Sequence, residues 1–126
     1  MANSILSIGV DICDINRIET LLSRYGGRIL DRLYTSGEIT YCNRKKPKFE
    51  SFAARFAAKE AFLKALGTGL RDGIQWKDIE VLNDPLGKPY FCLYNKAQEQ
   101  IGDRKVLLSL SHTAENAIAF VIIQGA

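Results

Sequence analysis

The sequence contains few cysteines, and their arrangement excludes two of the usual roles of cysteine. Only three, Cys13, Cys42 and Cys92, occur among the 126 residues, and no two of them have the short spacing of metal ligands. An odd number of scattered cysteines is typical of reduced, buried thiols and argues against a disulfide framework. We therefore assign no role to these thiols.

A long hydrophobic run is also missing. The longest, Ala117–Ile123, is far shorter than the roughly 20 apolar residues with which a helix crosses a membrane. The first four residues, Met1 to Ser4, lack the basic stretch that opens a signal peptide. We expect a cytoplasmic protein that makes no membrane contact.

Linkers and internal repeats are absent as well. A chain of 126 residues is long enough for one hydrophobic core and too short for two, so we expect a single domain over residues 1–126. With 47% hydrophobic and 25% charged residues, the composition is that of a folded globular protein. The net charge of +3 is compatible with phosphate-bearing ligands or with an acidic protein partner.

Dense basic clusters interleaved with aromatic residues, which are typical of nucleic-acid-binding proteins, do not occur. The one dense basic run is Arg44–Lys48. Pro47 disfavours a helical conformation at Lys46, so this run is expected to be a surface loop. Two interpretations stay open for it: a solubilising turn or a contact with phosphate.

The most informative segment is Phe49–Gly69, which predicts one long central helix. Residues that favour helices dominate it, Ser51 can cap an end, and Gly67 suits the left-handed position after the last turn. Alanines occupy one broad side, and phenylalanines and leucines occupy the opposite side. Both sides therefore favour burial.

Four charged residues of this helix lie among or beside its apolar sides. Arg55 and Lys59 are like charges at i,i+4, which costs about 0.2–0.5 kcal/mol unless an anion lies between them. Glu60 and Lys64 have the favourable orientation of a helical ion pair, which alone would be surface decoration. Together, a carboxylate and several cations indicate a site for a metal ion and phosphates.

The remaining segments predict an α+β fold, a mainly antiparallel sheet packed against the long central helix. We expect strands over residues 5–12, 76–82, 90–94, 106–111 and 117–123, and further helices over residues 15–25, 35–42 and 96–101. The third of these helices is the most polar, and the second opens with a capping box formed by Thr35 and Glu38.

The first strand places Ile8, Val10 and Ile12 on one side, and we expect it to be buried. Asp11 lies near the end of this strand. From its position alone, we expect it to form a turn or to cap the next helix, and Asp14 is a second candidate for the same role.

His112, the only histidine, stands where a strand meets a turn. A hydrogen-bonded turn residue is the commoner role there, and phosphate contact is the second. Arg17, Arg24 and Arg28 share one face if the helix or a second turn continues through Arg28. That face is either solvated or a dock for an acidic helix.

Two blocks of the chain resemble the bacterial holo-(acyl carrier protein) synthase group of 4′-phosphopantetheinyl transferases. They are Gly9–Glu19, GVDICDINRIE, and Arg55–Gly69, RFAAKEAFLKALGTG. The turn Leu86–Pro89 and the segment Ser109–Thr113 agree too, so the resemblance covers nearly the whole chain and implies the 4′-phosphopantetheinyl transferase fold.

The resemblance implies transfer of 4′-phosphopantetheine from coenzyme A to a serine of apo-acyl carrier protein, with release of adenosine 3′,5′-bisphosphate, in fatty acid biosynthesis. It implies that Asp11 and Glu60 bind Mg²⁺ and that Lys64 contacts the pyrophosphate. Glu60 either accepts the serine proton directly or acts through a metal-bound water; we favour the water route because a metal-bound carboxylate is a weakened base.

The resemblance also assigns the binding of the nucleotide phosphates to Arg55 and His112, with the loop around Arg44 to Lys46. The turn with Gly87 and Pro89 would meet the nucleotide of a neighbouring protomer, because this group is typically a homotrimer. The acyl carrier protein would dock on three arginines, Arg17, Arg24 and Arg28.

Two other classes of function are compatible with parts of the sequence. A small basic nucleic-acid-binding module would bind with a steep dependence on salt. A metal-dependent hydrolase of nucleotide phosphates would use the same carboxylates but would cleave coenzyme A without an acceptor.

Overall fold

The structure is a computed structural model that describes residues 4–125; Met1–Asn3, on which the signal-peptide expectation partly rests, lie outside the described residues. Its elements are β1 (Ile5–Asp14), α1 (Ile15–Tyr25), α2 (Gly27–Leu33), α3 (Ser36–Asn43), α4 (Lys48–Leu66), the 3-10 helix η1 (Trp76–Asp78), β2 (Ile79–Asn83), β3 (Pro89–Leu93), α5 (Asn95–Ile101), β4 (Lys105–His112) and β5 (Asn116–Gln124). Within residues 4–125, no helix combines the length and the apolar character that a membrane crossing requires.

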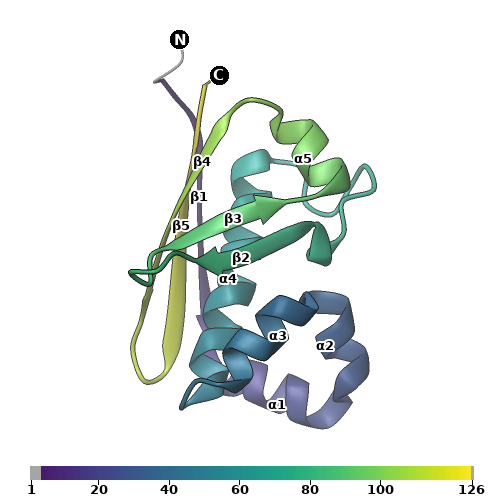
Figure 1. Cartoon of the computed structure of the whole chain (residues 1–126), viewed down its shortest axis with the longest axis vertical. Helices are drawn as coiled ribbons and strands as arrows, with labels where there is room; N and C mark the ends of the chain where they lie inside the picture. Colours follow the sequence, from purple (N-terminus) through teal and green to yellow (C-terminus); the bar gives the residue numbers. More distant parts are fainter. Residues whose placement is uncertain (1–3, 126) are drawn as a thin grey trace.

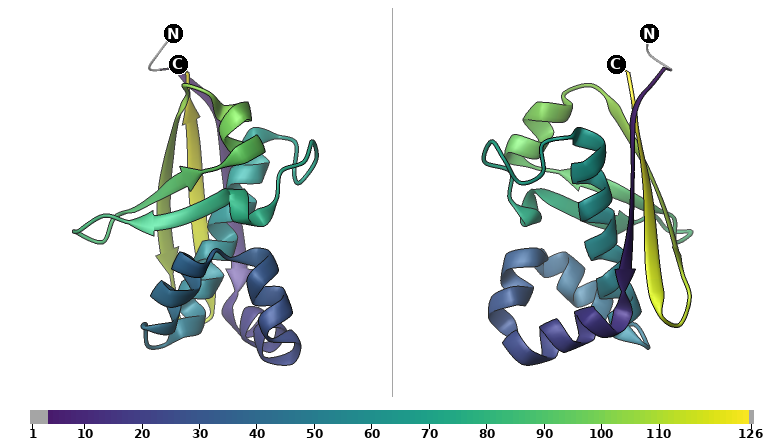
Figure 2. Two further views of the ribbon diagram at one scale, coloured as in Figure 1. Left: turned by 45° about the vertical axis from the view of Figure 1, so that its right-hand side comes forward. Right: turned by 180° about the vertical axis from the view of Figure 1, so that it is seen from behind.

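The strands form two antiparallel sheets, one with the order β1-β5-β4 and the other the hairpin β2-β3. The helix α4 packs along one face of the larger sheet (Figure 1). The helices α1, α2 and α3 gather at one end of the molecule and α5 at the other, and the view from behind shows that they all lie on the α4 side of the larger sheet (Figure 2). The antiparallel α+β architecture and the central helix are as the sequence predicts.

The central helix α4 begins one residue earlier than predicted and ends as predicted. Its first flanking residue is Pro47 and no side chain caps its N-terminus, so Ser51 lies inside the helix and the expected cap is wrong. At the other end, Gly67 adopts the left-handed conformation with φ 87° and its N–H donates to the carbonyl of Leu63. The alanine side is buried, with Ala57 and Ala61 fully inaccessible.

The backbone of β1 comes unusually close to α4 at Gly9. A Cβ atom at Gly9 would lie 2.1 Å from the carbonyl oxygen of Ala61 and 2.7 Å from the amide nitrogen of Ala65, far inside van der Waals contact. The hydroxyl of Ser7 donates a hydrogen bond to the carbonyl of Ala65 beside this contact. Glycine is therefore the one residue that permits this approach.

The opposite face of β1 contradicts the expectation of a buried strand. Ile8, Val10 and Ile12 are 58%, 53% and 62% exposed. In the register with β5, Val10 lies opposite Phe120 and Ile12 lies opposite Ile118. These five residues form the outer apolar face of the larger sheet, which α4 and the other helices leave uncovered (Figure 2).

Two other local expectations need correction, and one is confirmed. The strand predicted from Trp76 begins at Ile79, because residues 76–78 form the 3-10 turn η1. After Gly26, at φ 57°, the chain forms the additional helix α2 instead of a loop. The capping box of Thr35 and Glu38 is present at the start of α3.

We expect Gly9→Ala to lower the free energy of unfolding by at least about 2 kcal/mol, because overpacking against a helix backbone cannot be relieved by moving a side chain. Gly27→Ala is the matched control, since a Cβ there meets nothing within 4 Å and the residue is helical. Urea unfolding of both variants measures the difference. Equal stability of the two would show that β1 and α4 are not held in this close contact.

Candidate functional site

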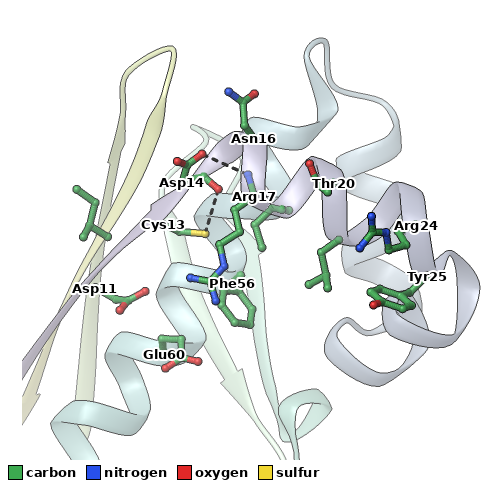
Figure 3. A pocket seen from close by; sticks show the side chains of 13 residues that line it. Asp11, Cys13, Asp14, Asn16, Arg17, Thr20, Arg24, Tyr25, Phe56 and Glu60 are labelled. Atoms are coloured by element: carbon green, nitrogen blue, oxygen red, sulfur yellow. Dashed lines mark hydrogen bonds between the residues drawn. The ribbon is translucent and has the colours of Figure 1, made fainter.

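Asp11 and Glu60 face one cavity between β1, α1 and α4, here called the first cavity. It has a volume of about 740 Å³, and its lining includes both carboxylates together with Arg17 and Arg24. Figure 3 shows Asp11 and Glu60 at one end of it and Arg24 toward the other. The structure thus brings together two acidic residues that are far apart in the sequence.

One of the two carboxylates, that of Asp11, forms an ion pair with Lys64. The Nζ atom of Lys64 donates to Oδ1 of Asp11 at 2.9 Å and to the carbonyl of Val10 at 3.2 Å. The helical ion pair between Glu60 and Lys64 is therefore replaced by a pair across to β1. Burial raises the pKa of Glu60, the charge of Asp11 raises it further, and Lys64 opposes both.

Asp11 is free for a site because another residue caps the following helix. The carboxylate of Asp14 accepts a hydrogen bond from the backbone N–H of Arg17 and caps α1. The pattern of the sequence alone had favoured a turn or cap role for Asp11, and that interpretation is wrong. Cys13 lies between Asp11 and Asp14 in the sequence. Burial raises the pKa of its thiol to about 11, so the thiol stays protonated.

The donor set at this point fits Mg²⁺. Among residues 4–125 no group of three or more His, Cys, Asp and Glu side chains is arranged to hold a metal ion by itself, so Asp11 and Glu60 form a pair and not a complete cage. A pair of carboxylates is what Mg²⁺ commonly takes from a protein, with the remaining positions filled by water and substrate phosphates. The repulsion that raises the pKa of Glu60 would be relieved by such a cation.

The three arginines proposed as a dock do not all share one helix. Arg17 and Arg24 lie on α1, are exposed, and line the first cavity. Arg28 lies on α2, because α1 ends at Tyr25, and it does not line that cavity. The three arginines therefore do not lie on one continuous helix, although all three are exposed and α1 and α2 lie at the same end of the molecule (Figure 1).

A second cavity, of about 390 Å³, brings together the other residues predicted to bind the nucleotide. Its lining contains Arg55 of α4, His112 of β4, and Gly87 and Pro89 beside the β2–β3 turn. From the basic loop, its lining contains Lys45 and Lys46 but not Arg44, which ends α3.

Arg55 is held in this cavity by two neutral groups. It is only 3% exposed, its guanidinium lies 4.1 Å from the centre of the Tyr41 ring, and Nη2 donates to the side-chain oxygen of Asn83 at 2.6 Å. Its Nε atom is buried and has no hydrogen-bond partner among residues 4–125. A buried guanidinium without an anion is a candidate anion site.

His112 has a looser environment than Arg55. Its side chain is about half exposed, and its Nδ1 atom lies 3.6 Å from Oε1 of Glu50, too far for a hydrogen bond. The ring is therefore available to a ligand in the second cavity.

Lys59 does not belong to either cavity. It is fully buried, its Nζ atom lies 2.7 Å from Oε1 of Glu38, and it also donates to the carbonyl of Trp76 at 3.1 Å. Glu38 accepts a further hydrogen bond from the backbone N–H of Val81. Lys59 is therefore not available to a ligand beside Arg55, because it is part of a buried ion pair that joins α3, α4 and β2.

The predicted site thus divides into two groups within one chain. The first and second cavities share no lining residue. A neighbouring cavity of about 530 Å³ contains both Glu60 and Lys64, which keeps Lys64 with the carboxylates. Arg55 precedes Glu60 by five residues, or roughly 140° around the helix, so the two groups lie on different sides of α4.

Residues 7–121 match the family described as the 4′-phosphopantetheinyl transferase superfamily, and the chain belongs to this superfamily. Among curated relatives, the holo-[acyl-carrier-protein] synthase of Geobacter sp. (strain M21) is 52% identical over 123 residues, covering 95% of this chain and 98% of the relative. That of Solibacter usitatus is 46% identical over 124 residues, covering 96% of this chain and 99% of the relative.

Solved structures lead to the same group of enzymes. The holo-[acyl-carrier-protein] synthase of Neisseria meningitidis superposes with a TM-score of 0.85 at 36% identity, covering 96% of this chain and 99% of that one. The enzyme of Helicobacter pylori, solved in complex with coenzyme A, superposes with a TM-score of 0.83 at 34% identity, covering 93% of this chain and 99% of that one. The fold of this chain is therefore that of the 4′-phosphopantetheinyl transferases.

Two residues beside the site, Tyr41 and Asn83, were not singled out from the sequence, and they hold Arg55. The pairing of Glu38 with Lys59 was not predicted either. The capping box marked Glu38 as a helix-start residue but carried no information about its second partner. Tyr41 and Asn83 carry no local signal, since each acts only through a residue distant in the chain.

We expect Glu38→Gln to lower the free energy of unfolding by about 3–5 kcal/mol, because it leaves the charge of Lys59 buried without its partner. Burial lowers the pKa of Lys59 from its ordinary value, while Glu38 opposes that shift. The unfolded chain therefore holds this proton more tightly, and between the two pKa values the free energy of unfolding rises with pH.

Because Glu38→Gln removes the opposing group, this rise should begin at a lower pH in the variant than in the wild type. Urea unfolding over a series of alkaline pH values measures it. Glu99→Gln, which removes an exposed ion pair with Lys96, is the control and should change stability by less than about 0.5 kcal/mol. A Glu38→Gln protein as stable as this control would contradict the buried pair.

Proposed function

We propose that the protein is a holo-(acyl carrier protein) synthase that transfers 4′-phosphopantetheine from coenzyme A to a serine of apo-acyl carrier protein. The observation that carries the proposal is the convergence of Asp11 and Glu60 on a cavity that the arginines of α1 also line, with Lys64 paired to Asp11 beside it. The relatives with full-length similarity carry this enzyme's name, and one was solved with coenzyme A. The whole of residues 1–126 would act as one domain.

In this reaction the serine oxygen forms a bond to the β-phosphorus of coenzyme A, the bond from that phosphorus to the bridging oxygen breaks, and adenosine 3′,5′-bisphosphate leaves. Asp11 and Glu60 are the residues that would hold Mg²⁺, which supplies neutralisation of the pyrophosphate charge when bound. Lys64, whose side chain is about half exposed, can turn from Asp11 to a phosphate oxygen. The serine proton would leave through a water molecule beside Glu60 rather than directly to it, because a carboxylate that holds Mg²⁺ is a weakened base.

The second cavity would bind the nucleotide end of the donor. Arg55 offers an unpartnered Nε, His112 a free ring, and Lys45 and Lys46 further positive charge. The turn with Gly87 and Pro89 closes one side of this cavity and would meet the nucleotide. The basic loop thus contributes to phosphate binding through Lys45 and Lys46 more directly than through Arg44.

We propose a homotrimer in which one chain supplies the carboxylates and a neighbour supplies the nucleotide cavity. Two observations support it: the two cavities share no residue within one chain, and the outer apolar face leaves Ile8, Val10 and Ile12 more than half exposed. Contiguous exposed apolar surface of this kind marks protein interfaces. Association of copies would cover that face and join the two halves of the site.

The α1 face would receive the acyl carrier protein, an acidic helical partner according to the resemblance. Arg17 and Arg24 stand beside the cavity that contains Asp11 and Glu60, so a carrier bound there would present its serine to the carboxylates. Arg28, on α2, would extend the positive surface. The reaction would take place in the cytoplasm, as a step that activates the carrier for fatty acid biosynthesis.

The proposed activity is tested by incubating the protein with coenzyme A, Mg²⁺ and apo-acyl carrier protein and recording the mass of the carrier. We expect the carrier to gain the mass of 4′-phosphopantetheine with the wild type. Asp11→Ala should abolish this gain without lowering thermal stability, because Asp11 is not the helix cap. Asp14→Ala, which removes the cap, is the contrasting variant and should lose about 1 kcal/mol of stability. An unchanged carrier in the presence of folded wild-type protein would exclude the proposed function.

Arg17→Glu should raise the KM for the carrier protein by about tenfold or more, because a charge reversal at an electrostatic dock slows association. It should change the affinity for coenzyme A much less, since the nucleotide would bind in the second cavity, which Arg17 does not line. Lys105→Glu makes the same charge change at the start of β4, away from α1, and serves as the control. Steady-state kinetics with each substrate varied in turn give the two KM values, and an equal loss for both substrates would argue against a separate dock.

A further inference from the structure

Asn83, the last residue of β2, joins two of the elements that line the second cavity. Its side-chain oxygen accepts a hydrogen bond from Nη2 of Arg55 at 2.6 Å, and its side-chain nitrogen donates to the carbonyl of Gly87 at 3.0 Å. One amide therefore connects the guanidinium on α4 to the β2–β3 turn.

The charge of Arg55 is held in place but is not neutralised. Among residues 4–125 no carboxylate forms an ion pair with this guanidinium, although it is 97% inaccessible. Its neighbours are the face of the Tyr41 ring and the amide of Asn83, and its Nε atom lacks a partner. The one carboxylate among the described residues that line the cavity, Glu50, lies against His112.

The proposed function identifies the anion that this charge would meet, and the inference rests on it. Coenzyme A carries a pyrophosphate and a separate phosphate on the 3′ position of its ribose. The reacting pyrophosphate belongs with Asp11, Glu60 and Lys64, and the second cavity shares no lining residue with the first. The phosphate that reaches Arg55 is therefore the 3′-phosphate.

We propose that Asn83 is a positioning residue that determines donor specificity, because it orients Arg55 with a neutral acceptor and so keeps the guanidinium charge available for the 3′-phosphate. An aspartate has nearly the same shape as asparagine but would place a carboxylate against the guanidinium. A charge-assisted arginine–carboxylate pair is stronger than a bond to a neutral amide, so it would compete with the phosphate. The amide is also the form that can donate to Gly87.

The test uses two nucleotides that differ in the 3′-phosphate, adenosine 3′,5′-bisphosphate and adenosine 5′-monophosphate, with binding measured by calorimetry. The wild type should prefer the bisphosphate. Asn83→Asp should weaken bisphosphate binding by about tenfold or more and change monophosphate binding much less, because a charged hydrogen-bond partner then occupies Arg55. The KM for coenzyme A should rise by a similar factor, more than kcat falls.

Two further variants separate this effect from damage and from general charge. Asn83→Ala removes the acceptor without adding charge, so it should weaken the preference less than Asn83→Asp does and should lower the melting temperature. Asn83→Asp also loses the hydrogen bond to Gly87 but gains an ion pair with Arg55, so it should lower the melting temperature less than Asn83→Ala does. Asn43→Asp makes the same charge change at an exposed position at the end of α3 and should leave the preference unchanged.

Three results would overturn the proposal: a wild type that does not prefer the bisphosphate, an Asn83→Asp variant that keeps the wild-type preference, or an equal loss of both nucleotides. The binding measurement needs no carrier protein, so it tests the effect of Asn83 on nucleotide affinity independently of the transfer reaction. A wild type that binds the bisphosphate selectively but does not modify the carrier would instead count against the proposed function.

Discussion

The close contact between β1 and α4 is the constraint on which the rest of the structure depends. Gly9 lets the strand approach the helix backbone so closely that any side chain would collide with Ala61 and Ala65. Asp11 lies two residues further along the same face of β1, and Glu60 is the neighbour of Ala61 on α4. The glycine therefore sets the separation of the two carboxylates as well as the packing of the core, and the single motif Gly-x-Asp serves both.

Burial distinguishes the charged residues of α4 from one another. Lys59 is enclosed with its partner Glu38, and the pair joins three elements of the fold. Arg55 is enclosed with neutral partners only, so its charge is left for a ligand. The side chain of Lys64 is about half exposed, and its ammonium group pairs with Asp11. The same helix thus supplies one cation in a buried ion pair, one buried cation with neutral neighbours and one partly exposed cation.

The sequence predicted the central helix, its glycine end and the antiparallel strands, because these depend on local periodicity. That Asp11 and Glu60 lie together was implied only by the resemblance to the family, and both residues line the first cavity. The predictions were wrong where contacts between distant segments determine the burial or the partner of a residue. The pattern of Ile8, Val10 and Ile12 is that of a buried strand, yet burial in one chain depends on what packs against that face. The role of Lys59 depended on Glu38, and the pairing of Lys64 with Asp11 on the approach of β1; neither is encoded within a short window of sequence.

Side chains alternate between the two faces of β1, so the register of its pairing with β5 decides which face carries Asp11. Odd-numbered Asp11 points toward α4 while even-numbered Val10 and Ile12 point away, since successive side chains of a strand face opposite sides. A slip of one residue in the pairing with β5 would turn the carboxylate outward and press bulky aliphatic groups against the helix backbone. Correct strand alignment during folding is thus a prerequisite for assembling the acidic pair, and misaligned molecules would be inactive as well as unstable.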